Sequence, residues 1–354
     1  MPDTIYLILE NGTVFEGRSF GARGETAGEL VFATGMNSYI ETLTDPSYCG
    51  QIVLQTFPLI GNYGIIPEDF ESEQTAAKAY IVKYPCQNPS NFRSEGILDT
   101  FLKERGIIGL CGIDTRELTR IIRSSGVMNG KITLSVPAES DRAEAADYII
   151  RDAVSSVSSR TVTRTGSGPR RAALMDFGAK RGIAAALESR GCEVWSFPYN
   201  TGADEIMRSK PDGILLSNGP GDPADPANSV IIETLRELIK TGIPIFGICL
   251  GHQLLALANG FSTQKLKFGH RGSNQPVRDT QTGRVYITSQ NHGYAVNADA
   301  DASSFINVND GTCEGLDYGC CFSVQFHPEA RGGPLDTLFL FDRFTERMDA
   351  HASR

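Results

Sequence analysis

The 354-residue sequence lacks several features that would assign it to a large class of proteins. No apolar run approaches the roughly 18 residues that a membrane-spanning helix requires. Residues 1–6 include no basic segment, so we expect no secretory signal. Eight cysteines without a C-x-x-C pair are too sparse for a disulfide scaffold and give little support to a zinc site. We therefore expect a cytoplasmic protein with no membrane partner, whose cysteines other than Cys249 are buried free thiols.

Motifs for nucleotides and metals are also missing. The sequence has no G-x-x-x-x-G-K-[ST] loop, no G-x-G-x-x-G after a strand and no H-E-x-x-H pair. Its 33 basic and 42 acidic residues give a net charge of −9, which argues against nucleic acid as a partner. We expect this chain to bind no metal and no cofactor.

The residues that are present suffice for two α/β domains, since 40% of them are hydrophobic. Residues 1–153 mix short strands and helices without a repeat, and begin with a hairpin around Asn11-Gly12, so we predict a mixed α/β domain. Residues 154–169 are rich in Ser, Thr, Gly and Arg, and we interpret them as a linker. In residues 170–354 strands and helices alternate, which predicts an open, mostly parallel sheet with helices on both faces. Ligands of such a sheet bind beyond the carboxyl ends of its strands.

One stretch of the C-terminal half has the pattern of a nucleophile elbow. Residues 243–248 form a short apolar run typical of a buried strand, and residues 252–259 have a helical pattern. Between them Gly247 and Gly251 bracket Cys249, as glycines bracket the serine of G-x-S-x-G. Such a turn presents the thiol at the edge of the sheet, near a helix N-terminus that favours the thiolate. Cys249 is therefore the predicted nucleophile.

A cysteine nucleophile needs a base and a group that orients the base, and only five histidines are available. His327 follows an apolar strand, 321–326, so we expect it at the same sheet edge as Cys249. Glu329, two residues further on, can fold back on the imidazole and fix its tautomer. His252 lies three residues past the cysteine and points in another direction. An isolated His-Pro-Glu is more often a turn, and only the cysteine in the same sheet favours a catalytic pair.

Two polar turns at strand ends could bind a substrate. Gly219 and Gly221 lie in a glycine-rich turn after the strand 213–217, where backbone N–H groups can approach an oxyanion. A tight turn before a helix would explain these glycines too. The N–H of Leu250 is the second donor that the geometry of an elbow provides. The other turn, 290–294, suits either a polar substrate or a plain hairpin.

Three motifs together resemble the class I, or triad, glutamine amidotransferases: Gly247-Ile-Cys-Leu-Gly-His-Gln253, Asn218-Gly-Pro-Gly-Asp222 and His327-Pro-Glu329. Segments of the N-terminal half, such as Thr44-Asp-Pro-Ser-Tyr-Cys-Gly-Gln-Ile52 and Gly112-Ile-Asp-Thr-Arg-Glu-Leu118, resemble the small-chain family of carbamoyl-phosphate synthases. Other triad amidotransferases lack this N-terminal domain. The chain departs from the family pattern at Tyr294, where Phe is usual, and at Arg271, Gln275 and Arg331-Gly332.

The resemblance implies a glutaminase that serves a ligase. Cys249 would attack the amide of L-glutamine and form a γ-glutamyl thioester, with His327 as acid and base and Glu329 as its orienter. The resemblance places further residues around the glutamine: Ser47, Gly219, Gly221, Leu250, Gln253, Asn291, Gly293 and Tyr294. Gly221 and Leu250 would donate to the oxyanion.

The resemblance also implies a heterodimer. Ammonia would pass to a large subunit, which uses ATP and Mg to make carbamoyl phosphate from bicarbonate for arginine or pyrimidine biosynthesis. Two alternatives stay open: the amidotransferase subunit of a different synthase, and a non-catalytic interaction subunit. A nucleotide- or chorismate-processing partner would favour the first, while the second leaves an intact nucleophile motif without a purpose.

Overall fold

The computed structural model describes residues 4–353 and divides the chain into two compact units, 1–151 (unit 1) and 152–354 (unit 2). Residues 1–3, at the start of the predicted N-terminal domain, and residue 354, at the end of the predicted C-terminal domain, lie outside the described residues. Each unit has its own hydrophobic core. None of the helices between residues 4 and 353 combines the length and hydropathy needed to cross a membrane.

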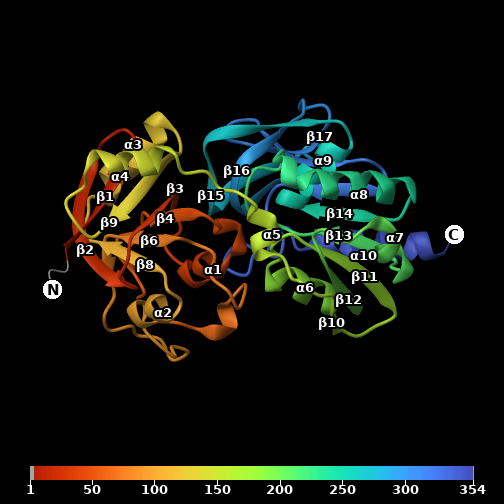
Figure 1. The fold of residues 1–354 in the computed structure, drawn as a ribbon. Helices are drawn as coiled ribbons and strands as arrows, with labels where there is room; N and C mark the ends of the chain where they lie inside the picture. The colour runs from red at the N-terminus through yellow and green to blue at the C-terminus, as the bar shows by residue number, and fades with distance from the viewer. Residues whose placement is uncertain (1–3, 354) are drawn as a thin grey trace. The chain divides into compact units, whose positions relative to one another are not determined.

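Unit 1 contains a closed β-barrel (Figure 1). In order around the barrel its strands are β1 (Thr4–Leu9), β2 (Val14–Gly21), β8 (Ile108–Cys111), β6 (Ala79–Val82), β4 (Gln51–Gln55), β3 (Thr26–Ala33) and β9 (Met128–Thr133), which pairs with β1. The predicted hairpin is confirmed, because β1 and β2 pair antiparallel across the Asn11-Gly12 turn. Strands β3, β4, β6 and β8 run parallel, and every residue of β4 and β6 is buried. Coverage of parallel strands on both faces explains their continuous apolar sequence.

Short helices and turns complete unit 1. The helices are α1 (Tyr39–Thr44), η1 (Pro46–Tyr48), η2 (Pro67–Asp69), α2 (Leu98–Glu104), α3 (Thr115–Ser125) and α4 (Glu139–Ala146). Two short strands, β5 (Leu59–Ile60) and β7 (Tyr84–Pro85), pair parallel in a separate sheet. Helix α3 begins after Asp114, whose side chain accepts a hydrogen bond from the N–H of Glu117, and ends at Gly126. The mixture of α and β is thus confirmed, but the hydrophobic pattern predicts neither β9 nor α4 nor the closure of the barrel.

Unit 2 is one sheet with a parallel middle and antiparallel flanks (Figure 1). The parallel strands, in order, are β12 (Cys192–Pro198), β11 (Arg170–Asp176), β13 (Gly213–Leu216), β14 (Ile245–Ile248) and β19 (Cys321–Val324). Antiparallel β10 (Thr163–Gly166) lies beside β12, and beyond β19 follow β18 (Cys313–Asp317), β16 (Val285–Asn297), β15 (Ser262–Asp279) and β17 (Ser303–Asn307). The predicted parallel sheet is confirmed for the middle strands. The antiparallel flank differs from the prediction, because the long strand β15 is mostly polar and resembles a loop in sequence.

Helices cover both faces of the parallel strands, as predicted. They are α6 (Arg181–Glu188) and α10 (Phe339–Ala352) on one face, and α7 (Ala203–Arg208), α8 (Ser229–Lys240) and α9 (Leu250–Ala258) on the other, with η3 (Pro226–Asn228) leading into α8. Successive residues of β11 show the alternation, because Leu174 packs with the first group and Met175 with the second. The carboxyl ends of β13, β14 and β19 therefore meet at one edge of a covered sheet.

The segment predicted as a linker, 154–169, is partly regular. Helix α5 (Ala153–Val157) opens it, and β10 pairs antiparallel with β12, with Arg164 opposite Trp195. The Arg164 guanidinium lies 3.5 Å from the centroid of the Trp195 ring, a cation–π contact that favours this pairing. The polar composition of residues 154–169 predicts a flexible segment. The edge of β12 nevertheless supplies hydrogen-bonding partners for the backbone of β10, and this pairing orders that part of the segment.

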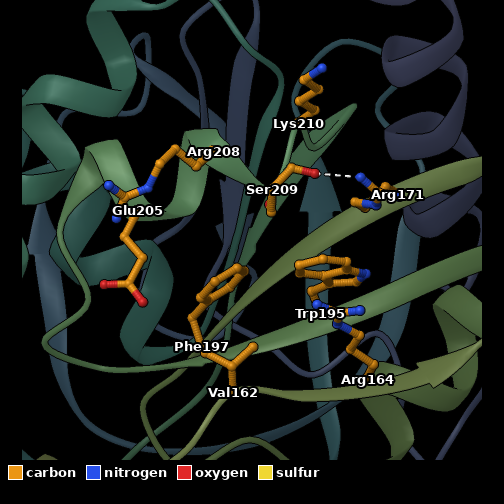
Figure 2. A pocket seen from close by; sticks show the side chains of 9 residues that line it. All are labelled: Val162, Arg164, Arg171, Trp195, Phe197, Glu205, Arg208, Ser209 and Lys210. Atoms are coloured by element: carbon orange, nitrogen blue, oxygen red, sulfur yellow. Dashed lines mark hydrogen bonds between the residues drawn. The ribbon is translucent and has the colours of Figure 1, made fainter.

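Next to this strand pair lies a cavity of about 350 Å³ (Figure 2). Val162 and Phe197 form apolar walls, and four cationic side chains also line the cavity: Arg164, Arg171, Arg208 and Lys210. Stacking against the indole accounts for the places of Arg164 and Arg171. The residues that line this cavity include none of the predicted site residues.

Candidate active site

Cys249 lies on a strained turn between β14 and α9. Its φ of 54° and ψ of −104° belong to a region that non-glycine residues rarely occupy. Close packing explains the flanking glycines: a Cβ on Gly247 would lie 2.7 Å from the carbonyl oxygen of Gly251, and a Cβ on Gly251 would lie 2.4 Å from that of Leu216. The sharp strand-to-helix turn predicted from the glycine spacing is therefore confirmed.

Backbone hydrogen bonds fix this turn to the neighbouring strands. The N–H of Cys249 donates to the carbonyl of Val324 on β19 at 2.9 Å, and the N–H of Gly251 donates to that of Ser217 at 3.0 Å. The cysteine is buried, and its Sγ lies 3.8 Å from the carbonyl oxygen of Asn291. Helix α9 begins at Leu250, so the N–H of Leu250 belongs to the first turn of a helix, where backbone donors lack intrahelical acceptors.

His327 and Glu329 form a buried pair after β19. The two strands β14 and β19 are parallel neighbours, which brings His327 to the sheet edge that carries Cys249. His327 Nδ1 lies 2.7 Å from Glu329 Oε1, and both side chains are less than 5% exposed. The backbone N–H of His327 donates to the carbonyl of Ser289 at 2.9 Å, which holds the turn in place. Within residues 4–353, His327 Nε2 makes no hydrogen bond of ordinary geometry, so this nitrogen is the one that can exchange a proton.

Electrostatics keep this pair charged. Burial and the ammonium of Lys180 lower the pKa of His327, but Glu329 and Cys249 outweigh them and raise it to about 10. Burial raises the pKa of Glu329, but His327 and Lys180 bring it below its usual value. An imidazolium and a carboxylate therefore face each other at neutral pH, as the orienting role of a carboxylate requires.

Lys180 is a site residue that the sequence analysis missed. Its Nζ lies 3.8 Å from Glu329 Oε1, and its N–H donates to Asn218 Oδ1 at 3.1 Å. The position of Lys180 just past β11 could have indicated that it belongs to the site, because the other site residues also follow parallel strands. A second cation beside Glu329 helps to keep this carboxylate ionised.

Among the predicted glutamine-binding residues, the structure brings Gln253, Asn291 and Tyr294 close to Cys249. Gln253, one turn into α9, donates from Nε2 to the carbonyl of Tyr294 at 2.8 Å and to Gln325 Oε1 at 2.9 Å. Asn291 and Tyr294 belong to β16, and the Asn291 carbonyl contacts the thiol as described above. The segment 290–294 is thus part of a strand and not the hairpin turn considered as its alternative.

The predicted glycines differ in how closely the structure joins them to the elbow. Gly219 packs on it, because a Cβ there would lie 2.7 Å from Leu250 Cδ2 and 2.3 Å from the carbonyl oxygen of Phe177. Gly221 has a φ of +91° and lies against Ala153. Its role as an oxyanion donor stays a prediction.

Two further predicted residues lie in different surroundings. A Cβ on Gly293 would lie 3.3 Å from Arg271 Nη2, so this glycine leaves room for the guanidinium. Ser47 belongs to unit 1, where it is buried in η1 and its N–H donates to Asp45 Oδ1 at 2.9 Å. The parts of Gly293 and Ser47 in glutamine binding stay predictions.

The other histidines and cysteines have structural surroundings. His252 is fully buried, its Nδ1 lies 2.8 Å from Ser323 Oγ, and burial lowers its pKa to about 3, so it is neutral. All eight cysteines are free, as predicted. The expectation of burial is wrong for Cys320, which is exposed, and for Cys49 and Cys86, which are half-buried, because surface positions also tolerate a small thiol.

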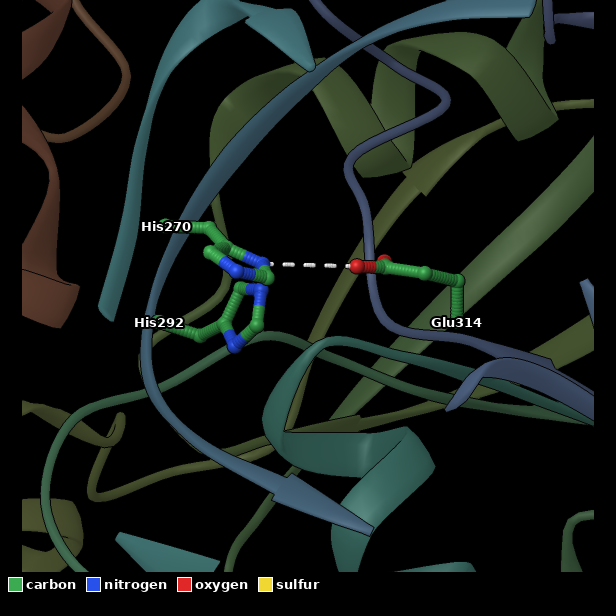
Figure 3. A group of neighbouring side chains, drawn as sticks. All are labelled: His270, His292 and Glu314. Carbon is green, nitrogen blue, oxygen red and sulfur yellow. Dashed lines mark ion pairs between the residues drawn. The ribbon is translucent and has the colours of Figure 1, made fainter. Parts of the chain in front are cut away.

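One group of the described residues has side chains suited to a metal ion: His270, His292 and Glu314, with potential ligand atoms within 4.8 Å of one another (Figure 3). Protein groups already occupy these atoms. Glu314 accepts hydrogen bonds from Asn307 and Gln290, and both ring nitrogens of His292 lie within hydrogen-bond distance of oxygens. We therefore assign no metal to this group, and the predicted absence of a metal stays a prediction.

Comparison with known proteins indicates one family. Residues 7–132 match the model of the carbamoyl-phosphate synthase small chain, CPSase domain, and residues 173–347 match that of glutamine amidotransferase class-I. The chain is 51% identical over 353 residues to the carbamoyl phosphate synthase small chain of Fusobacterium nucleatum, covering 97% of this chain and 98% of that one. It is 50% identical over 361 residues to the pyrimidine-specific small chain of Halalkalibacterium halodurans, with 98% of both covered. It is 49% identical over 351 residues to that of Bacillus subtilis, with 97% and 95% covered.

Proposed function

We propose that this chain hydrolyses L-glutamine through Cys249, His327 and Glu329. It belongs to the carbamoyl phosphate synthase small chain family, whose members are the glutamine-hydrolysing subunits of that enzyme. The single observation that carries this residue assignment is the buried His327–Glu329 pair, 2.7 Å apart, beside a cysteine on a strained elbow. A nucleophile, a base and an orienting carboxylate from adjacent parallel strands have the arrangement that acyl transfer requires.

The reaction follows from these roles. Because His327 is an imidazolium that already carries the proton on Nε2, Cys249 reacts as the thiolate of a thiolate–imidazolium pair and attacks the amide carbon of the glutamine side chain. The oxyanion accepts hydrogen bonds from the N–H groups of Leu250 and Gly221. His327 then gives this proton to the leaving nitrogen, so ammonia departs and a γ-glutamyl thioester remains. Water, deprotonated by His327, attacks the thioester, which releases glutamate and restores the thiolate–imidazolium pair.

Substrate recognition is the proposed role of the residues around this centre. Gln253, Asn291 and Tyr294 would hold the glutamine near the thiol, with Gly219 and Gly293 beside it. The hydrogen bond from Gln253 to the Tyr294 carbonyl supports this proposal, because it ties the helix that begins at the elbow to the strand that would bind the substrate.

Ammonia then passes to a large subunit in a cytoplasmic heterodimer, where ATP, Mg and bicarbonate are used. The sequence supports this division of labour, because it has no phosphate-binding loop. Two of the relatives are named pyrimidine-specific, which supports a place in pyrimidine biosynthesis, with arginine biosynthesis as the other outlet. Similarity to small chains over 97% of this chain disfavours the subunit of a different synthase.

Replacing Cys249 tests the proposal. In the complex with its large subunit, we expect Cys249→Ser to lower glutamine-dependent carbamoyl phosphate synthesis by about a thousandfold or more, because the hydroxyl is a much weaker nucleophile. Synthesis from free ammonia should continue at the wild-type rate. Cys320→Ser, which changes an exposed thiol, is the matched control and should leave both rates unchanged. Full glutamine-dependent activity in Cys249→Ser would refute the assignment.

A further inference from the structure

A buried carboxylate lies behind the strand that carries the proposed glutamine-binding residues. Glu314, on β18, is fully buried. Its Oε1 accepts a hydrogen bond from Asn307 Nδ2 at 3.1 Å and lies 3.4 Å from His270 Nδ1 (Figure 3). Its Oε2 accepts from Gln290 Nε2 at 3.0 Å. Glu314 is thus linked by Gln290 to β16.

The hydrogen bonds continue from Gln290 to the site. Gln290 Oε1 lies 3.1 Å from His292 Nε2, and His292 Nδ1 lies 2.7 Å from the carbonyl oxygen of Tyr294. The same carbonyl accepts the hydrogen bond from Gln253. Gln290 and His292 are both at most 5% exposed, so water does not replace these partners easily. A continuous chain therefore runs from Glu314 to the proposed site.

A count of protons shows that this chain needs one more than its neutral histidine provides. Both nitrogens of His292 face oxygens that cannot donate, Gln290 Oε1 and the Tyr294 carbonyl, whereas a neutral imidazole has a single N–H. If Glu314 is ionised and His292 neutral, one of these short contacts sets a lone pair against a lone pair. Such an arrangement is costly in a buried network.

Two arrangements give both nitrogens of His292 a matching partner, and they contain the same number of protons. In one, His292 is an imidazolium and Glu314 is ionised. In the other, Glu314 is protonated, the amide of Gln290 is reversed so that its nitrogen donates to His292 Nε2, and neutral His292 donates from Nδ1 to the Tyr294 carbonyl. This second arrangement gives up the hydrogen bond from Gln290 Nε2 to Thr288 Oγ1, which is 3.2 Å long. The reversal is open, because amide oxygen and nitrogen are assigned from their partners.

We propose that Glu314 is a positioning residue for glutamine binding, and that the proton it shares with His292 holds the Tyr294 carbonyl and Gln253 in place. This inference rests on the proposed function, since it concerns the residues taken there to bind glutamine. It assigns to Glu314 no contact with the reacting atoms.

The surrounding charges favour the arrangement with a protonated Glu314. Burial raises the pKa of Glu314, although His270 lowers it, and burial together with His270, Arg271 and His327 holds the pKa of His292 well below its usual value. His270 faces both Glu314 and Asp310; burial lowers its pKa, and its hydrogen bond to Asp310 is the largest cause that raises it. His292 is therefore neutral near pH 7, and of the two arrangements only the one with the shared proton on the carboxyl group remains.

The test separates substrate binding from chemistry. We expect Glu314→Ala to raise the KM for glutamine by about tenfold and to change kcat by less than about threefold, because it loosens binding and leaves the triad intact. Glu314→Gln should keep the wild-type KM at neutral pH, since its amide donates where the carboxyl proton does.

Controls make the outcomes distinct. Wild type must hydrolyse glutamine and Cys249→Ser must not; otherwise the proposed function fails and not this inference. Glu346→Ala, an exposed carboxylate of α10, should leave KM unchanged. With an active wild type, an unchanged KM in Glu314→Ala would overturn the positioning role, and an equal defect in Glu314→Gln would overturn the shared proton. If Glu314→Ala does not fold, Gln290→Met interrupts the same chain and must raise KM likewise.

Discussion

At the scale of single residues, the elbow depends on a glycine outside the triad. Gly251 leaves no space for a methyl group, because a Cβ would lie 2.4 Å from the Leu216 carbonyl. We expect Gly251→Ala to lower the free energy of unfolding by about 1–3 kcal/mol. The fluorescence of Trp195, the only tryptophan, reports this change in urea. Gly202→Ala is the control, since that glycine has an ordinary φ of −73° and nothing within 4 Å. Equal losses in the two variants would contradict this explanation.

The His327–Glu329 pair should make stability depend on pH. The folded-state pKa of His327 is raised, so its contribution is complete below the ordinary value of 6.5 and is lost as the pH rises through about 10. The pKa of Glu329 is lowered, so its contribution is complete above the ordinary value of 4.5 and is lost in acid. Both contributions are therefore complete between pH 4.5 and 6.5.

Glu329→Gln removes this dependence. We expect it to cost about 3 kcal/mol of unfolding free energy near pH 6, because it leaves one buried charge without its partner. The difference from wild type should shrink as the pH approaches 10. Urea unfolding of both proteins over this range measures it, and a difference that stays constant from pH 6 to the alkaline end would show that the pair is not charged.

Residue types and spacing predicted the turn at Cys249 and the pairing of His327 with Glu329, because an elbow and a strand end are local features. The positions of Lys180 and Glu314 could not be predicted from the sequence. Lys180 meets Glu329 only after β11 and β19 have taken their places in the sheet. Glu314 is a buried carboxylate inside a short, weakly apolar strand, and its partners come from strands 7 to 44 residues away in sequence. Such networks depend on register, which no local pattern contains.

At the scale of elements, one side-chain pair helps to hold β10 against β12. Arg164→Ala removes the guanidinium from the face of Trp195 and should lower the unfolding free energy by about 0.5–1 kcal/mol. Circular dichroism in urea measures this loss without relying on the altered fluorescence. Arg160→Ala, an exposed arginine of the same segment, should have no effect. If both variants behave alike, charge and not stacking orders the segment.

The elements that escaped prediction have one cause in common. Strands β9 and β15 are polar, and hydrophobic patterning finds only strands that bury apolar faces. In β9 the polar residue Lys131 is nevertheless buried, because Asp141 and Glu144 accept its charge. Ion pairing therefore allows a charged residue at a buried position of β9, where a hydrophobic residue would have indicated the strand. The strands that were predicted, such as β4 and β14, are buried at every position.

At the scale of the whole molecule, the two units have separate cores and should respond separately to damage. Leu30 is fully buried in unit 1 and Leu235 in unit 2. Either change to Ala should cost about 2–5 kcal/mol. We expect Leu30→Ala to shift the transition seen by circular dichroism and to leave the Trp195 fluorescence midpoint in place, whereas Leu235→Ala shifts that midpoint. A fluorescence shift in Leu30→Ala would mean that the units unfold together.

The sheet of unit 2 divides its labour between two kinds of strand pairing. The cysteine and the His–Glu pair follow the parallel strands β14 and β19, while the segment proposed to hold the substrate belongs to antiparallel β16. The parallel strands tolerate few substitutions, because helices pack on both of their faces. The antiparallel strands tolerate substitutions more easily. Substitutions in the antiparallel strands, in evolution or in protein engineering, can therefore alter which amide substrate is bound, while Cys249, His327 and Glu329 stay unchanged.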